Sequence, residues 1–397
     1  MAEPEHDPRP ATVREPGRSA FLDLSRPDIG DDEIAEILDS LRAGWLTTGP
    51  KVERLQEGLQ DYLGVEHVQC LTSCTAGLML GLRTAGIGPG DEVLVPTLTF
   101  VSCANAIEQV GARPVFVDAD PATGLLDLDH AESRIGPATR GMMIVHLTGR
   151  PVDMERVNEL RDRHELVVME DAAHAIGAEW AGRRVGAWGN HASFSFHATK
   201  NMTTFEGGAL VVRDAETADR VAQLARHGLS RSAWTRHGRA APDRYDVVEP
   251  GFKLAMNDIS GAVGIHQLRR LDENIAKRAR LAEAYDRALE GLPLRTPPGV
   301  APGARHAHHV YAVQVDDDAP LGRDELIEGL LRRNIGSSVH FRPIHTYSYY
   351  AERYGLELDD LPVARRLGDR LLSLPLFPRM TLDDVDDVAR ALGDLLG

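Results

Sequence analysis

The chain has 397 residues, of which 43% are hydrophobic and 5% are aromatic. A chain of this length can bury a large core and usually divides into two domains. Its formal net charge of −16 argues against nucleic-acid binding, because neutralising phosphates needs a concentrated basic face. No apolar run approaches the length that spans a bilayer, so we expect no membrane partner.

The composition predicts three parts along the chain. Residues 1–20 are rich in Pro, Glu and Arg and lack the apolar core of a signal peptide, which predicts a disordered N-terminal tail. Strand-like and helix-like segments alternate along most of the remainder. We predict a large ligand-binding domain over residues 21–270 and a smaller α+β domain over residues 271–397.

The large domain is predicted from two kinds of segment. Short β-branched or apolar runs predict buried strands at 68–71, 92–95, 114–117, 141–147 and 166–170. Apolar residues at three-to-four spacing predict helices at 75–84, 101–109 and 154–164. This alternation indicates an α/β fold with a mostly parallel sheet that is covered by helices.

The pattern changes after residue 258. Two long helices are predicted at 259–271 and 273–289, followed by a strand at 310–315, a helix at 323–334, a strand at 337–341 and a helix at 382–396. These elements no longer alternate as in the first part, which is why we assign them to a separate, smaller α+β domain.

The three cysteines, Cys70, Cys74 and Cys103, include no Cys-x-x-Cys pair. An odd set without such a pair indicates neither a disulfide framework nor a zinc site. It fits a protein of the reducing cytoplasm.

Lys200 is one of four lysines in a chain that otherwise places its positive charge on arginine. It ends the segment Ser193-Phe-Ser-Phe-His-Ala-Thr-Lys200, so its amine lies in a largely apolar stretch. A deprotonated amine can form a Schiff base, which a guanidinium cannot. The alternative is a lysine that caps a strand end and extends its amine to water.

A second cluster, Leu71-Thr-Ser-Cys-Thr-Ala-Gly-Leu78, joins a predicted strand to a predicted helix. Unpaired N–H groups and the positive end of the helix dipole bind anions at such a junction. The hydroxyls of Ser73 and Thr75 add neutral donors for a phosphate. The alternative is that Ser73 only caps the helix.

A third cluster, Met169-Glu-Asp-Ala-Ala-His-Ala175, follows a predicted buried strand. An acidic residue at the carboxyl end of a parallel strand lies where α/β proteins bind ligands. Asp171 could keep a pyridinium nitrogen protonated, and His174 could reach the phenolic oxygen of a pyridoxal ring. The alternatives are a helix cap for Asp171 and a surface or core histidine for His174.

In chain order, the three clusters are a hydroxyl-rich turn, an acidic residue after a strand and a lysine. This order resembles that of pyridoxal 5′-phosphate (PLP) enzymes with the aspartate-aminotransferase fold, PLP fold type I, and in particular the DegT/DnrJ/EryC1/StrS family of sugar aminotransferases. The resemblance extends from Phe21 to the C-terminus and implies a sheet of the seven-stranded type. Further segments carry it: Gly44-Trp-Leu-Thr-Thr-Gly-Pro-Lys-Val52, Val95-Pro-Thr-Leu-Thr-Phe-Val101, Val145-His-Leu-Thr-Gly149, Gly251-Phe-Lys-Leu-Ala-Met-Asn-Asp-Ile259 and Ser373-Leu-Pro-Leu-Phe-Pro378.

The resemblance implies a role for each matching residue. Lys200 would form the Schiff base with the cofactor and act as the proton-transfer group. Asp171 would pair with the ring nitrogen, Phe100 would stack on the pyridine face, and Ser195 would help to hold the phosphate.

Ser73, Cys74 and Thr75 fall on the Ser-Gly-Thr phosphate turn of the family. Cys74 replaces the glycine, which leaves the backbone donor but places a side chain near the ligand. Lys253 lies in a loop that is expected to reach the phosphate site of a neighbouring subunit, so the resemblance implies a homodimer with shared active sites.

The resemblance also selects a branch of the family. Lys253 stands where members that act at sugar C3 commonly carry asparagine, and Glu206-Gly-Gly208 replaces their Asp-Gly-Gly or Asp-Ala-Gly. The segment 334–345 resembles the C4-aminating branch that includes UDP-4-amino-4-deoxy-L-arabinose aminotransferase. Within it, His340 and Arg342 are expected to contact the nucleotide diphosphate; a structural strand histidine is the alternative for His340.

The implied reaction moves the amino group of L-glutamate to a nucleotide-linked 4-keto sugar, giving a 4-amino sugar nucleotide and 2-oxoglutarate. Three alternatives stay open. These are amination at C3 of a nucleotide-linked keto-sugar or of a keto-cyclitol, dehydration of a keto-sugar, and a regulatory role without catalysis. Dehydratase relatives replace the lysine by histidine, and Lys200 is present.

Three further histidines, His306, His308 and His309, could suggest a metal site. They precede a predicted strand in a family that uses no metal. We therefore interpret them as structural and expect no metal ion.

Overall fold

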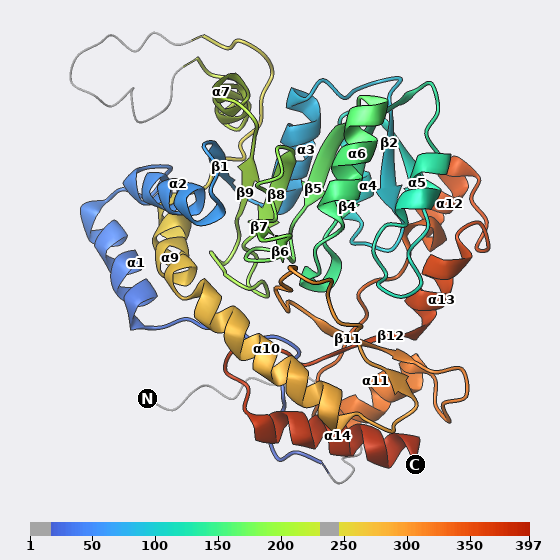
Figure 1. Cartoon of the computed structure of the whole chain (residues 1–397). Coiled ribbons are helices and arrows are strands. Elements are labelled where there is room, and N and C mark those ends of the chain that lie inside the picture. Colours follow the sequence, from blue (N-terminus) through green and yellow to red (C-terminus); the bar gives the residue numbers. More distant parts are fainter. Residues whose placement is uncertain (1–16, 231–245) are drawn as a thin grey trace.

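The computed structural model describes residues 17–230 and 246–397, so most of the predicted N-terminal tail lies outside the described residues. Its centre is a seven-stranded sheet in the order β1-β9-β8-β5-β4-β2-β3 (Figure 1). The strands are β1 (Val68–Leu71), β2 (Glu92–Pro96), β3 (Arg113–Val117), β4 (Thr139–Val145), β5 (Val167–Asp171), β8 (His191–Ser195) and β9 (Gly208–Val211). Only β9 runs antiparallel to its neighbours, β1 and β8. The predicted α/β fold with a mostly parallel sheet is confirmed.

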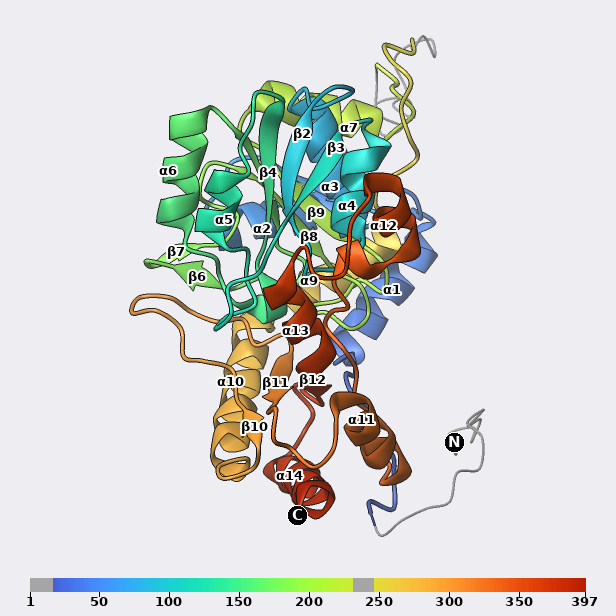
Figure 2. The same ribbon diagram turned by 90° about the vertical axis from the view of Figure 1, so that its right-hand side faces the viewer.

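Helices cover both faces of this sheet, because its strands are apolar and buried on both sides. Figure 2 shows α3 (Cys74–Thr84), α4 (Ser102–Gln109) and α7 (Ala215–Leu224) on one side, and α5 (Leu128–Ser133) and α6 (Met154–His164) on the other. Near β1, α2 (Pro50–Leu63) packs against α9 (Asp258–Arg269), and α9 also contacts α1 (Asp31–Ala43).

A second hydrophobic core lies below the large sheet in Figure 1. It is built by α10 (Leu271–Ala288), α11 (Arg323–Arg332), α14 (Leu382–Leu396) and an antiparallel sheet of β10 (Leu294–Arg295), β11 (Tyr311–Val315) and β12 (Leu371–Leu374). Leu22 is buried in the same core. The predicted domain boundary falls between α9 and α10, which follow each other directly, and it stays a prediction.

Several short elements complete the described chain. They are η1 (Leu147–Gly149), β6 (Glu179–Trp180), β7 (Arg183–Arg184), η2 (Ile344–Thr346), α12 (Ser348–Tyr354) and α13 (Pro362–Arg370). Tyr350 of α12 packs edge-on against Phe116 of β3, with ring centroids 5.6 Å apart. The C-terminal part of the chain therefore reaches back onto the large sheet.

One predicted strand, at 337–341, is wrong. In this segment only Ser338 pairs in a sheet-like manner, through two backbone hydrogen bonds with Ser373 of β12. The chain then leaves the sheet, and both His340 and Phe341 line one cavity, whereas neighbouring side chains of a strand would point to opposite faces. The other predicted elements named above lie within two residues of the observed ones. Two strands of the large sheet, β8 and β9, were not predicted, and neither were α1, α2, α5, α7, α12, α13, β6, β7, β10 and β12.

Candidate active site

A cavity of about 340 Å³ lies at the carboxyl ends of β4, β5 and β8. This is the edge where open parallel sheets bind ligands. Nine of the predicted site residues line it: Ser73, Cys74, Thr75, Phe100, Asp171, His174, Ser195, Lys200 and His340. The remaining lining residues are Thr99, Ser102, Val145, Ala173, His197, Thr199, Glu206, Gly207 and Phe341.

The junction between β1 and α3 forms one wall of the cavity. Ser73 is the N-cap of α3, and its Oγ accepts the N–H of Ala76 at 3.1 Å. The capping role considered above is therefore present, and it leaves the hydroxyl hydrogen of Ser73 available to a ligand. Gly208 lies so close that a Cβ there would meet the backbone of Ser73 and Cys74 at 2.5 Å. The lack of a side chain at Gly208 lets β9 pack directly behind this turn.

Asp171 is the last residue of β5, and its side chain is buried. Its Oδ1 accepts the N–H of Ala173 at 3.0 Å, and its Oδ2 accepts the thiol of Cys103 at 2.9 Å. No helix begins here, so the alternative of a helix cap is wrong. Within the part of the chain that the structure describes, no Lys, Arg or His lies within ion-pair distance of this carboxylate. Asp171 thus places a carboxylate without an ion-pair partner among the described residues at the edge of the cavity.

Lys200 follows β8, in a turn where its N–H donates to the carbonyl oxygen of His197 at 3.0 Å. Burial lowers the pKa of its amine, and the negative charge of Asp171 opposes this effect only in part. The side chain lines the cavity, and the described residues offer it no ion-pair partner. A larger fraction of this amine is therefore neutral and nucleophilic than for an ordinary lysine.

His174 is buried beside the same cavity. Its Nδ1 accepts the N–H of Thr148 at 3.2 Å, so the neutral ring carries its proton on Nε2. Burial lowers the pKa of His174 well below its usual range, with smaller effects from Lys200 and His340. The ring of Phe341 lies nearly parallel to it, at 5.8 Å between centroids. His174 therefore offers a neutral N–H donor.

Aromatic rings border the cavity on its other side. Phe100 is 55% exposed although it lines the cavity, and its ring centroid is 5.7 Å from that of Phe341. His340 hydrogen-bonds through Nδ1 to Ser373 Oγ at 2.8 Å, and burial lowers its pKa to about 4. A large apolar ring that stays exposed in a cavity is available to stack on a planar ligand.

Comparison with known proteins identifies the group to which this site belongs. The family model described as the DegT/DnrJ/EryC1/StrS aminotransferase family matches residues 27–393. The chain belongs to this family.

Individual relatives of the family cover nearly the whole chain. The spore coat polysaccharide biosynthesis protein SpsC of Bacillus subtilis is 42% identical over 96% of this chain and 98% of its own length. The PLP form of Spr1654 from Streptococcus pneumoniae has a TM-score of 0.88 at 30% identity, covering 95% of this chain and 100% of that one. The sugar aminotransferase CalS13 from Micromonospora echinospora has a TM-score of 0.84 at 31% identity, covering 94% and 100%.

Members of the DegT/DnrJ/EryC1/StrS family are PLP-dependent sugar aminotransferases, and this chain is accordingly a PLP-dependent enzyme. The cavity residues fit that cofactor. An amine of lowered pKa, a carboxylate without an ion-pair partner and a helix N-terminus with hydroxyls on Ser73, Thr75 and Ser195 match an aldehyde, a ring nitrogen and a phosphate.

Two residues predicted from the family pattern do not line this cavity. Lys253 is exposed and forms an isolated backbone bridge with Arg226. Arg342 is also exposed, and its guanidinium bonds to Thr346 and lies over the ring of Tyr347. Their roles toward a second subunit and a nucleotide diphosphate stay predictions.

Several residues without a predicted site role are brought here by the fold. Cys103 contacts Asp171, and Thr99 lies behind Cys103 at 3.5 Å. The centroid of the His309 ring lies 4.4 Å from that of His174, and the Phe341 ring stacks on His174 at 5.8 Å. Cys103 is 68 residues from Asp171 along the chain, so no local pattern could have paired them.

Of the three histidines considered as metal ligands, His306 and His308 have stacked rings with centroids 4.4 Å apart. Within residues 17–230 and 246–397, no three His, Cys, Asp or Glu side chains are grouped so that they could hold a metal ion. Over the same residues, no helix combines the length and the apolar character of a membrane span.

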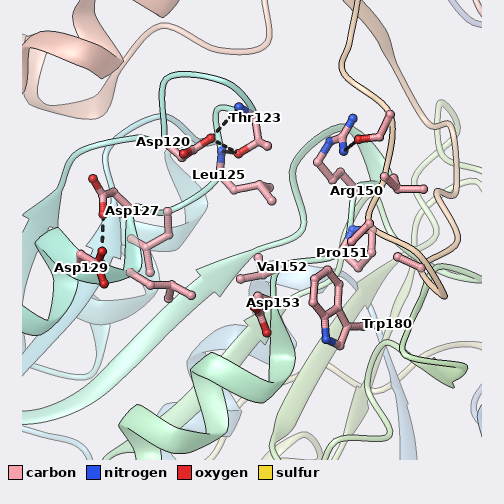
Figure 3. Close-up of a pocket in the computed structure, with 16 residues that line it drawn as sticks. Asp120, Thr123, Leu125, Asp127, Asp129, Arg150, Pro151, Val152, Asp153 and Trp180 are labelled. Atoms are coloured by element: carbon pink, nitrogen blue, oxygen red, sulfur yellow. Dashed lines mark hydrogen bonds between the residues drawn. The ribbon is translucent and has the colours of Figure 1, made fainter.

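A second cavity of about 380 Å³ contains no lysine (Figure 3). It is bordered by the loops after β3 and β4 and by Trp180. Asp127 and Asp153 line it, and each caps the helix that follows it. Arg150 donates to the carbonyl oxygen of Gly299 at 2.9 Å and also to that of Pro298. None of the predicted site residues lies there, so the two cavities are chemically distinct.

Proposed function

We propose that this enzyme transfers the amino group of L-glutamate to C4 of a nucleotide-linked 4-keto sugar. The products would be a 4-amino sugar nucleotide and 2-oxoglutarate. The observation that carries the proposal is the cavity in which the Lys200 amine, with its lowered pKa, lies together with the Asp171 carboxylate and the N-terminus of α3. These groups are the ones that PLP-dependent transamination needs.

The proposed roles follow from the chemistry of each group. PLP, when bound, supplies an aldehyde that accepts an amine and a ring that delocalises negative charge. The hydroxyls of Ser73 and Thr75, with the N–H groups of the first turn of α3, hold the phosphate, and Ser195 assists them. Asp171 holds its negative charge toward the ring nitrogen. Phe100 covers one face and excludes water from it.

Lys200 is the proposed proton-transfer group. In its neutral form, which the lowered pKa favours, Nζ removes the proton from the α-carbon of glutamate and holds it for return in the following step. In the second half of the reaction, when the keto-sugar accepts the amino group, Lys200 carries out the same proton transfers in the reverse order. A guanidinium could not take this part, because it stays protonated at every accessible pH.

The choice of C4 rests on the family pattern at Lys253 and at Glu206-Gly-Gly208. Glu206 lines the cavity, so the residue type at this position can affect the sugar directly. His340 also lines the cavity and is the proposed contact to the nucleotide part, together with Arg342 after movement of its exposed side chain. The relative SpsC is named for spore coat polysaccharide biosynthesis, which supports a surface polysaccharide as the destination of the amino sugar.

We further propose a homodimer with shared active sites. The segment that carries Lys253 runs beside the phosphate turn, since Thr72 donates its N–H to Leu254 at 2.8 Å, yet the Lys253 side chain is exposed. An apolar stripe on α1 is also exposed: Ile34, Leu38 and Leu41 are 43–50% accessible. Such a stripe is typical of a surface that a partner covers.

A cytoplasmic location is proposed from the three free, buried thiols.

The function is tested by supplying PLP, L-glutamate and a panel of UDP- and dTDP-linked 4-keto and 3-keto sugars while following 2-oxoglutarate. We expect turnover with 4-keto sugars. Lys200→Ala should lower the rate at least about 1,000-fold, because both nucleophile and proton carrier are lost. Lys277→Ala, on the exposed side of α10, is the matched control and should keep full activity.

The proposal fails if the cofactor binds normally and no keto-sugar is aminated. Turnover confined to 3-keto sugars would leave the aminotransferase assignment in place and overturn the assignment to C4.

A further inference from the structure

Two thiols contact the carboxylate of Asp171. The Sγ of Cys103 lies 2.9 Å from Oδ2, and the Sγ of Cys74 lies 3.6 Å from Oδ1. Both thiols are buried, and they come from α4 and α3, two helices on the same face of the sheet. The position of Asp171 is therefore fixed by elements other than its own strand.

The two thiols are not equivalent. Cys74 is also within 3.4 Å of the carbonyl oxygen of Ser193, so its single proton is shared between two acceptors. Cys103 has one strong acceptor, Asp171, and Thr99 Oγ1 lies 3.5 Å behind its sulfur. Burial and the charge of Asp171 raise the pKa of Cys103 well above its usual range, so the sulfur stays protonated and can donate. Cys103 is the main side-chain donor to Asp171.

This donor matters because Asp171 has no cationic partner in the described chain to hold its charge. A buried carboxylate without donors binds a proton more readily. On the opposite oxygen, Oδ1, Asp171 accepts the N–H of Ala173 at 3.0 Å and the shared thiol of Cys74 at 3.6 Å. The Cys103 thiol thus supplies Oδ2 with a hydrogen bond, and it limits rotation of the carboxylate about the Cβ–Cγ bond of Asp171.

We propose that Cys103 is a positioning residue that holds the Asp171 carboxylate in the orientation needed for the PLP ring nitrogen. The inference rests on the proposed function, specifically on the pairing of Asp171 with that nitrogen. Without the Cys103 donor, Oδ2 would lose its main side-chain contact and the carboxylate would be freer to rotate. A displaced carboxylate would then hold the proton on the ring nitrogen less well.

The test uses the holoenzyme loaded with PLP that carries nitrogen-15 in its ring, whose NMR resonance reports protonation of that nitrogen. In Cys103→Ala we expect the resonance to move toward that of neutral pyridine. We also expect kcat to fall about 10-fold, with KM for glutamate changed less than about 3-fold, because one hydrogen bond to a charged group is lost. Cys103→Ser keeps a donor and should retain the wild-type resonance and kcat within about 3-fold.

Cys70→Ala is the matched control. Cys70 is a buried cysteine of β1 whose thiol makes no hydrogen bond among the described contacts, and it lies outside the cavity lining. It should leave both the resonance and kcat unchanged. Thermal melting of every variant separates loss of fold from loss of function, and the serine variant remains informative if the alanine variant does not fold.

Asp171→Asn separates this inference from the proposed function. If Asp171→Asn leaves the ring-nitrogen resonance unchanged, the pairing of Asp171 with the ring fails. If Asp171→Asn moves the resonance and Cys103→Ala does not, the role of Cys103 fails alone. Equal loss of kcat in Cys103→Ala and Cys103→Ser would also overturn the role of Cys103. The loss would then depend on side-chain shape and not on hydrogen-bond donation.

Discussion

At the scale of single residues, the reactivity of Lys200 arises from its surroundings. The sequence indicated this lysine through its rarity and its apolar neighbours. The fold adds what a sequence pattern cannot give, a half-buried lysine whose amine is desolvated near a carboxylate that does not pair with it. Pairing would have restored an ordinary, protonated lysine, whereas burial without pairing favours the neutral amine.

The lowered pKa of Lys200 predicts how stability of the apoprotein depends on pH. At neutral pH, folding places an amine where its charged form is disfavoured, so Lys200→Met should raise the melting temperature of the apoprotein. Between the lowered pKa and the ordinary value of 10.5, the unfolded chain binds more protons than the folded one. Wild-type stability therefore rises with pH in this window, and the advantage of Lys200→Met should shrink. Melting curves across this window measure it.

Lys277→Met provides the control for this measurement. Lys277 pairs with Glu273 on the surface of α10 at 2.8 Å, and such a pair contributes at most about 1 kcal/mol. An advantage of Lys200→Met that stays constant up to pH 10.5, or no advantage at neutral pH, would show that burial of the amine carries no cost.

At the scale of elements, the strand-to-helix junction at Ser73 was predictable because its signals are local. A hydroxyl residue before an apolar helix marks an N-cap, and the observed helix begins at the next residue. β8 and β9 lack such signals, since β8 contains His and Ser and β9 begins with glycine. The erroneous strand at 337–341 shows the converse, because contacts of His340 and Phe341 within the cavity outweigh the local strand pattern.

The two roles proposed for Ser73 predict a divided result for Ser73→Ala. Loss of the N-cap should destabilise the apoprotein by about 1 kcal/mol. Loss of a phosphate donor should in addition weaken PLP binding about 10-fold. Thr381→Ala is the matched control, because Thr381 caps α14 through the N–H of Asp384 at 3.2 Å and lies outside the cavity lining.

Unfolding by urea and fluorimetric titration with PLP measure the two quantities separately. Both variants should lose similar stability, and only Ser73→Ala should lose affinity for the cofactor. Equal PLP affinity in Ser73→Ala and Thr381→Ala would leave Ser73 with the capping role alone.

At the scale of the whole molecule, the α/β fold and the family could be predicted because motifs in a fixed order cover most of the chain. Contacts between distant segments could not, and the cavity depends on them. Cys103 with Asp171, and His309 with His174, are brought together only by the packing of helices and loops around the sheet. The surface that another subunit would cover likewise appears only when α1 is folded against α9.

The exposed stripe on α1 predicts the effect of a charge placed within it. Leu41→Glu should convert the proposed dimer to a monomer, because burying an unpaired carboxylate in an apolar interface costs several kcal/mol. Activity should fall at least about 10-fold if the partner completes the phosphate site. Leu358→Glu, at another leucine of similar exposure, should leave the mass and activity unchanged. Light scattering after gel filtration measures the mass; a fully active monomer of either variant or of the wild type would contradict shared active sites.

The central claim, transfer of the glutamate amine to C4 of a sugar nucleotide, is tested most directly by the position of a labelled nitrogen. L-glutamate carrying nitrogen-15 is supplied with PLP and a nucleotide-linked 4-keto sugar, and the product is examined by NMR. We expect the label on the sugar, bonded to C4, with one 2-oxoglutarate formed for each labelled sugar. Label bonded to C3, or an unlabelled sugar although the cofactor is bound at Lys200, would contradict the account.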